Sequence, residues 1–197
     1  MTVPHRGYAA MKQEGSLAGK FLIAMPGLRD AHFERAVLFV CSHTSDGALG
    51  LVINQPHPVS MREIMQQLGL TWQRDDDQPM VFQGGPVALD RGFILYERTL
   101  DCPGYIEVEK GLYLGTNPDI LRHLSGDAGG RFLLALGYSG WSGGQLEAEL
   151  KANAWLVSAP NRDVLFDAPP LERWHVALRE LGIDPALLVD PGAHLIN

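Results

Sequence analysis

Residues 131–159 constrain the possible folds more than any other part of this chain. The run 132–136 is continuously apolar, too short to span a membrane, and typical of a strand buried on both faces. The glycine-rich segment 137–144 follows and predicts backbone turns that a Cβ would obstruct. A helix over 143–153 and a strand over 155–157 complete a strand–helix–strand unit, and the helix is long enough for a crossover.

The start of this predicted helix allows two interpretations. Ser142 precedes Gln145 by three residues, which is the spacing of a capping box. Free N–H groups at such a position can also bind an anion. The glycines lack the spacing of a dinucleotide site, and no Lys-Ser/Thr pair follows them as in a phosphate-binding loop. Close packing of helix against strand is therefore favoured over ligand binding.

The rest of the chain predicts strands in hairpins and short amphipathic helices. Strands are predicted over residues 19–25, 36–42, 49–54, 80–83, 92–96, 105–108, 112–114 and 164–166. Helices are predicted over residues 61–68, 118–124 and 171–181. Early hairpins followed by a late crossover unit favour an α+β fold. We expect one domain over residues 16–197, preceded by a flexible leader, residues 1–15.

Charge and composition exclude several classes of protein. The chain has 197 residues, of which 46% are hydrophobic and 20% charged, as in an ordinary globular domain. Its formal net charge of −7 disfavours direct nucleic-acid binding, which depends on Lys and Arg. The sequence shows neither a signal peptide nor a membrane-spanning run, and its 2 cysteines are too few for a disulfide framework. We therefore expect a cytoplasmic protein with no membrane partner.

Several unusual blocks of sequence resemble those of the AlgH/YqgE family, a bacterial family with relatives in plant organelles. The resemblance extends from about residue 17 to about residue 188 and rests on these blocks, in order: GKFLIAMPGLRDAHFERAVLFVCSH, GALGLVINQP, VFQGGPV, RGFILYE, and GYSGWSGGQLEAEL followed by NAWL. It implies a strongly bent mixed β-sheet, folded toward a barrel, with flanking helices. Members are often labelled transcriptional regulators, a label drawn from alginate regulation. The family commonly ends near a Gly-His-Ala element, whereas this chain has Gly192-Ala193-His194.

Cys41 and His43 form the first candidate site. Residues two apart in a strand point to the same face, so the thiol and the imidazole could approach each other. A histidine cation would lower the pKa of the thiol and make it reactive. Free cysteine also packs well as a small buried side chain, and this structural interpretation is favoured.

Three polar or glycine-rich blocks at the ends of predicted strands form the second candidate, a ligand-binding rim. Its proposed members are Asn54, Gly84, Gly85, Trp141, Ser142 and Gln145. Strand ends can converge on one rim, where backbone and amide groups line a pocket. The alternative is that these blocks are turns, as their residue types favour, and this alternative is preferred.

No pattern in the sequence predicts a metal site or a cofactor. The 7 histidines lack zinc spacing. Asp30, His32 and Glu34 alternate, and Asp75-Asp76-Asp77 is an acidic run, but both are typical of solvated loops. The Gly-Trp-Ser-Gly-Gly sequence has the wrong register for a hydrolase elbow.

Two functional hypotheses remain. The first is a non-catalytic regulatory or ligand-binding module that acts through a protein or small-molecule partner. The alternative is a thiol-based redox sensor or enzyme that uses Cys41 with His43. Direct DNA binding ranks third because of the acidic charge.

Overall fold

The fold is built on one strongly curled sheet of ten strands, seen in a computed structural model that describes residues 8–9, 15–28, 30–126 and 129–188. The strands are β1 (Tyr8–Ala9), β2 (Phe21–Ala24), β3 (Val37–Thr44), β4 (Gly47–Val52), β5 (Val81–Gln83), β6 (Val87–Tyr96), β7 (Tyr105–Glu109), β8 (Leu112–Gly115), β9 (Phe132–Ser142) and β10 (Trp155–Ser158). Their order across the sheet is β1-β7-β8-β6-β9-β4-β3-β2-β10, and β5 also pairs with β9. The expected α+β fold with a bent sheet is confirmed.

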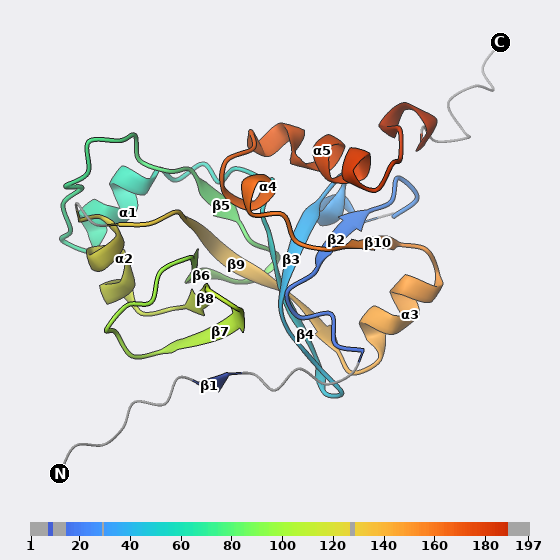
Figure 1. The fold of residues 1–197 in the computed structure, drawn as a ribbon, viewed down its shortest axis with the longest axis horizontal. Helices are drawn as coiled ribbons and strands as arrows, with labels where there is room; N and C mark the ends of the chain where they lie inside the picture. Colours follow the sequence, from blue (N-terminus) through green and yellow to red (C-terminus); the bar gives the residue numbers. More distant parts are fainter. Residues whose placement is uncertain (1–7, 10–14, 29, 127–128, 189–197) are drawn as a thin grey trace.

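Strand β9 joins the two halves of the sheet (Figure 1). One half contains β1, β7, β8, β6 and β5, and the other contains β4, β3, β2 and β10. Its first half pairs antiparallel with β6 on one side and parallel with β5 on the other. Its second half pairs antiparallel with β4, with Gly50 opposite Ser139 and Gly47 opposite Ser142. The predicted crossover is also present, since three antiparallel strands lie between β9 and β10 and make these two parallel.

Alternate side chains of the central strands enter different hydrophobic cores. In β2, Phe21 and Ile23 face a core shared by both halves of the sheet, whereas Leu22 and Ala24 face the core beneath α3. In β9, Leu133 and Ala135 face the shared core, whereas Phe132 and Leu134 face the core of α1 and α2. This double burial explains the continuous apolar runs of the sequence. Because strands of both halves contribute to the shared core, the sheet forms one folding unit.

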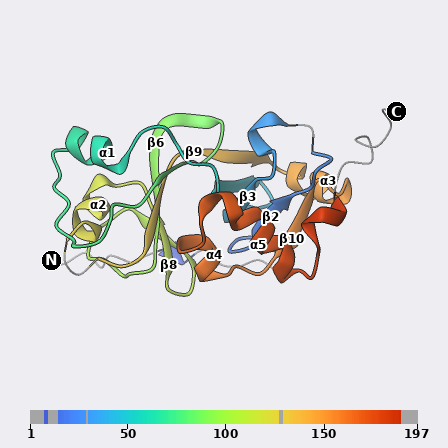
Figure 2. The same ribbon diagram turned by 90° about the horizontal axis from the view of Figure 1, so that it is seen from above.

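Short helices cover the faces of the sheet. They are η1 (Ala31–Phe33), α1 (Met61–Gln67), α2 (Pro118–Leu124), α3 (Gln145–Lys151), α4 (Arg162–Phe166), η2 (Pro170–Glu172), α5 (Arg173–Glu180) and η3 (Pro185–Leu188). Helices α1 and α2 lie together at one end of the molecule, and α3 lies at the other (Figures 1 and 2). Helix α5 packs against β2 and β3 over the shared core. No helix in the described part of the chain is long and apolar enough to cross a bilayer.

Three local predictions were wrong. The predicted turns at 137–142 are instead the second half of β9, which runs to Ser142. Helix α3 begins at Gln145, after Gly144 in a left-handed conformation, and Ser142 makes no N-cap bond to it. Residues 164–166 belong to α4 rather than to a strand, because the Asn161 side chain accepts a hydrogen bond from the Asp163 N–H and caps a helix.

The leader is only partly described. Residues Tyr8–Ala9 form β1 and pair parallel with β7, so this part of the leader is not free chain as the sequence predicted. The rest of residues 1–14, the final residues 189–197 and with them the Gly192-Ala193-His194 element lie outside the described residues.

The halves of the sheet meet closely at Gly84. The Gly84 carbonyl accepts a hydrogen bond from the Val52 N–H at 2.9 Å, and its N–H donates to the Leu136 carbonyl at 2.8 Å. A Cβ at Gly84 would collide with the Gly137 carbonyl oxygen and lie 2.9 Å from Ala135 Cβ. Glycine is required here because backbone packs directly on backbone.

We expect Gly84→Ala to lower the free energy of unfolding by about 2 kcal/mol or more, since two strands must separate to admit the methyl group. Urea unfolding followed by circular dichroism measures the change. Gly27→Ala is the matched control, because nothing lies within 4 Å of a Cβ built there. Equal stability of the two variants would contradict this account of Gly84.

Candidate functional site

The Cys41 thiol is buried and does not meet His43. Its side chain is 1% exposed in the shared core, and its Sγ donates to the Phe39 carbonyl at 3.6 Å. A β-bulge lies here, because Val40 pairs with Gly50 while Ser42 already pairs with Leu49. The extra residue, Cys41, breaks the alternation on which the sequence prediction depended. Cys41 and His43 therefore occupy different surroundings, and the predicted thiol–imidazole pair is wrong.

His43, in β3, instead forms hydrogen bonds to the segment before β2 and to helix α3. Its Nδ1 accepts a hydrogen bond from the Leu17 N–H at 3.0 Å, so the proton of the neutral ring is on Nε2. The Nε2–H group donates to Glu147 Oε1 of α3 at 2.8 Å. The His43 side chain is 9% exposed. Both ring nitrogens are thus occupied by structural bonds, and neither is positioned to activate the Cys41 thiol.

The three blocks of the predicted rim do not converge. Asn54 and Gly84 lie near each other, since Gln83 N–H donates to the Gln55 carbonyl at 2.9 Å. The block 140–144 begins beside the first residues of β4, where Gly140 pairs with Leu49 and Ser142 with Gly47. Asn54 follows Gly47 by seven positions of largely extended chain, roughly 20 Å. A single rim lined by all six predicted residues is therefore wrong.

Each predicted rim residue has a structural partner. Asn54, 7% exposed, accepts from the Val37 N–H and donates to the Arg35 carbonyl, both at 2.8 Å. Gly84 and Gly85 pack against residues 135–139 of β9. Gln145 Oε1 accepts from both the N–H and the hydroxyl of Ser142 at 3.1 Å.

Trp141 belongs to a buried aromatic pair. Its ring centroid lies 6.2 Å from that of Trp155, with the planes at 77°. Both indole N–H groups donate to Glu149 Oε2 of α3, at 2.9 Å from Trp141 and 2.7 Å from Trp155. One carboxylate oxygen thus joins β9, α3 and β10, and Trp141 is 6% exposed.

The two acidic segments are held by local bonds. Asp30 caps η1 by accepting from the His32 N–H at 2.9 Å, and its carboxylate also meets His32 Nδ1 at 3.0 Å. Asp76 forms an ion pair with Arg74. The expected solvated loop fits Asp75-Asp76-Asp77, whereas residues 31–33 form the short helix η1 rather than a loop.

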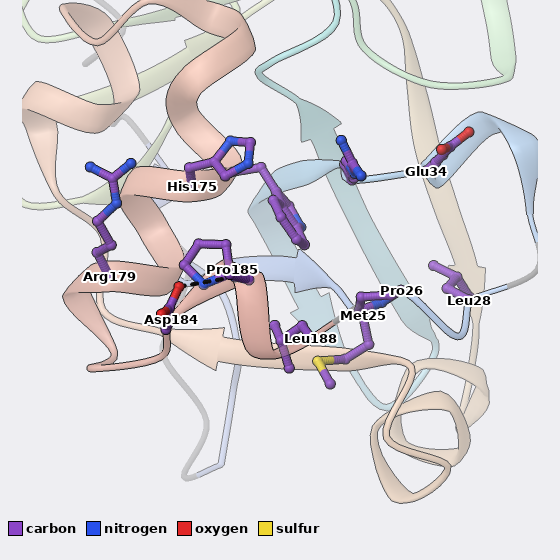
Figure 3. A pocket seen from close by; sticks show the side chains of 12 residues that line it. Met25, Pro26, Leu28, Glu34, His175, Arg179, Asp184, Pro185 and Leu188 are labelled. Atoms are coloured by element: carbon purple, nitrogen blue, oxygen red, sulfur yellow. Dashed lines mark hydrogen bonds between the residues drawn. The ribbon is translucent and has the colours of Figure 1, made fainter. Parts of the chain in front are cut away.

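A cleft of about 590 Å³ lies beside α5 (Figure 3). Figure 3 shows His175, Arg179 and Asp184 on one side, and Glu34 and Leu28 on the other. Met25 and Leu188 close the lower part in this view. Cavities of about 300–1,000 Å³ are typical of small-molecule sites. No motif in the sequence marked the residues of this cleft as a site.

Trp174 is the central ring of the cleft. It is 4% exposed, and its indole N–H donates to the Ala24 carbonyl at 2.9 Å. The Arg35 guanidinium lies 5.6 Å from the centroid of this ring, within cation–π range. The His175 ring stands edge-on to it at 5.1 Å and 87°. Trp174 is therefore a largely buried part of the cleft lining, and the Arg35 cation and the His175 imidazole lie against its ring.

Arg35 is held in a strained backbone conformation. Its φ of 49° lies in the left-handed region, which non-glycine residues seldom adopt. The buried Asn54 amide holds this conformation, because it donates to the Arg35 carbonyl and accepts from Val37 N–H. Strain of this kind persists only where neighbouring structure imposes it, and it concentrates at functional sites. Asn54 is therefore connected to the cleft, although as a support for Arg35 rather than as a rim residue.

The cleft carries both signs of charge. Arg35 and Arg179 are exposed, and within the described ranges neither guanidinium forms an ion pair with a carboxylate. Glu34 and Asp184 supply negative charge at the margins. The arrangement suits a ligand that places an acidic group on the guanidinium groups and an apolar part against the partly buried side chains of Met25, Leu28 and Leu188.

The comparisons with known proteins agree with this fold. The AlgH-like family model matches residues 21–186. A UPF0301 protein of Magnetococcus marinus is 55% identical, with 92% of this chain and 98% of that protein covered. A UPF0301 protein of Verminephrobacter eiseniae is 42% identical, with coverages of 91% and 96%.

Two solved structures have a similar fold. The solution structure of the AlgH protein from Pseudomonas aeruginosa superimposes with a TM-score of 0.72 at 36% identity, over 93% of this chain and 98% of that one. The crystal structure of protein DIP2367 from Corynebacterium diphtheriae gives a TM-score of 0.66 at 16% identity, over 87% and 90% of the chains. The second likeness concerns the fold alone.

We expect Cys41 to resist alkylation in the native protein. Burial raises the pKa of its thiol far above the usual value, so little thiolate exists at pH about 8. Mass spectrometry after iodoacetamide treatment should show Cys41 modified at least about 100-fold more slowly than in urea, because reaction requires opening of the core. Rapid modification of the folded protein would contradict the assigned burial.

The bond between Glu147 and His43 predicts a pH-dependent contribution to stability. The pKa of the Glu147 carboxyl is lowered from about 4.5, first by the backbone N–H of Glu147 itself and then by His43. The folded-state pKa lies below the unfolded one, so this stabilisation is complete above about pH 4.5 and is lost as pH falls through the folded value.

In Glu147→Gln the amide oxygen still accepts from His43, but the titrating charge is gone. The stability difference between the native chain and this variant should therefore shrink from about pH 6 to about pH 3. Urea unfolding over this range measures it. Asp75→Asn, at an exposed position, serves as the comparison. A difference that does not vary with pH would contradict the role of the Glu147 charge.

Proposed function

This chain belongs to the AlgH-like family, and we propose that it is a regulatory binding protein whose ligand occupies the cleft around Trp174. The ligand class that the cleft suits best is a small molecule with an acidic group and an apolar part. The observation that carries the proposal is the imposed conformation of Arg35, whose guanidinium stands over Trp174 at the cleft. No step of catalysis is included in this role.

The acidic balance of the chain supports action through a partner rather than on DNA. A net charge of −7 opposes the approach of phosphate backbones. We therefore propose that ligand binding alters contact with a partner protein, which carries the effect on transcription that the family label describes. The two buried free thiols, Cys41 and Cys102, are consistent with a proposed location in the cytoplasm.

Nuclear magnetic resonance tests ligand binding directly. A library of small organic carboxylates and phosphates is titrated into isotope-labelled protein, and backbone amide shifts are followed. The proposal expects at least one compound to shift the amides of the two cleft walls, around Leu28 and around His175, with saturation. No such compound at millimolar concentration would overturn the proposal, and tight binding to duplex DNA at about 0.15 M salt would overturn the partner-mediated action.

The variant Arg35→Gly tests whether the guanidinium contributes to ligand binding without a large change in the stability of the fold. Glycine adopts a φ of 49° without strain, so removal of the side chain changes the free energy of unfolding by less than about 1 kcal/mol. Loss of the guanidinium should weaken binding of the acidic compound about tenfold or more. Thermal unfolding and the same titration give the two numbers.

Ala88→Gly is the matched control for this variant, because Ala88 has the same φ of 49° and does not line the cleft. It should bind the compound as the native protein does. Unchanged affinity in Arg35→Gly would remove Arg35 from the site.

A further inference from the structure

Arg173, the first residue of α5, is a buried cation on the other side of the helix from the Trp174 cleft. Its side chain is 3% exposed. Its Nε donates to the Ala168 carbonyl at 3.0 Å, and its Nη1 donates to the Ile53 carbonyl. The guanidinium lies over the Phe82 ring, 4.9 Å from the centroid.

The charge of Arg173 has no carboxylate bonded to it in the described part of the chain. Burial lowers the pKa of the guanidinium to about 10, so it remains a cation at neutral pH. The acidic group that acts on it is Asp167, and this carboxylate is bonded to the Arg131 guanidinium instead. The N-terminal position in α5 adds positive potential from the helix dipole. A buried charge is costly unless it is paired, so an anion placed against this guanidinium would be stabilised.

A groove of about 320 Å³ ends on this arginine. Its walls are mainly apolar, and they include Met80, Phe82, Phe132, Leu165, Phe166 and Pro170. The bonds of Arg173 use Nε and Nη1, whereas Nη2 has no acceptor among the described residues and is not enclosed as a buried unsatisfied atom. The remaining donor therefore opens into the groove that the side chain lines.

We propose that this groove binds a small monocarboxylic acid, with its carboxylate on Nη2 of Arg173 and its apolar body against the aromatic and proline side chains of the walls. The proposal concerns a second site and does not rest on the ligand proposed for the Trp174 cleft. A carboxylate supplies the oxygen acceptors that a guanidinium binds best.

Two acidic residues at the groove set the charge of the ligand. Asp77 is exposed and lines the groove, and Asp167 lines it as well. The basic groups facing the same region, Arg74 and Arg131, are already bonded to carboxylates. The groove thus offers one cation with one remaining donor nitrogen, and two carboxylates line the same groove. The cation can balance the single charge of a monoanion, whereas the carboxylates repel the additional charge of a dianion.

Titration with benzoate tests the site. Benzoate should shift the side-chain Nε–H signal of Arg173 and the backbone amides around Ala168, with saturation. Benzyl alcohol has a similar shape but no charge, and it should bind at least about tenfold more weakly. Phenylphosphonate, largely a dianion near pH 8, should also bind more weakly than benzoate.

A pair of exposed aspartates provides variants that leave the buried arginine intact. Asp77→Asn removes negative charge from the mouth and should tighten benzoate binding about threefold at low ionic strength. Asp75→Asn, two residues away and outside the groove, should leave the affinity unchanged. Arg173→Lys keeps a cation but loses the planar fork and should weaken binding, provided that the variant folds.

Three results would overturn the proposal. Equal affinities for benzyl alcohol and benzoate would mean an apolar groove without an anion site. The same affinity in Asp77→Asn, in Asp75→Asn and in the native chain would mean that the ligand does not lie near the groove mouth. Shifts confined to the Trp174 cleft, or no shift at any millimolar benzoate concentration, would place no carboxylate on Arg173.

Discussion

Burial of both faces of the central strands is the constraint on which the rest of the structure depends. Side chains of β2, β3 and β9 enter the shared core on one face and a separate core on the other. These strands therefore tolerate few polar residues, and polar chemistry is confined to positions where a strand ends or a helix begins. Arg35, just before β3, and Arg173, at the start of α5, both occupy such positions.

The sequence predicted the parts of the fold that follow from short-range patterns. Continuous apolar runs identified β2, β3 and β9, and an early hairpin of the kind predicted is present where β3 pairs antiparallel with β4. The errors arose where a single residue altered the pattern. The bulge at Cys41 reversed the alternation of β3, and the Asn161 cap made a helix of residues that have strand propensity.

The candidate sites were not predictable in the same way. Trp174 lies within the predicted helix 171–181 and is 4% exposed, so the sequence pattern does not distinguish this cleft-lining residue from an ordinary core residue. Arg35 is recognised only by its φ and by a bond from Asn54, nineteen positions away. Neither a dihedral angle nor a contact of that separation leaves a local mark in the sequence. Asn54 was predicted to line a ligand-binding rim, whereas its amide instead supports the backbone of Arg35 beside the cleft.

The paired indoles of Trp141 and Trp155 give the protein an internal optical reporter. Their ring centroids are 6.2 Å apart, and both donate to one oxygen of Glu149. Chromophores this close exchange excitation energy, so they absorb polarised light as a coupled pair rather than as two separate groups. Any displacement of α3 that moves the Glu149 carboxylate would break its hydrogen bonds to both indoles, so tryptophan absorption and fluorescence would report whether the helix has left the sheet.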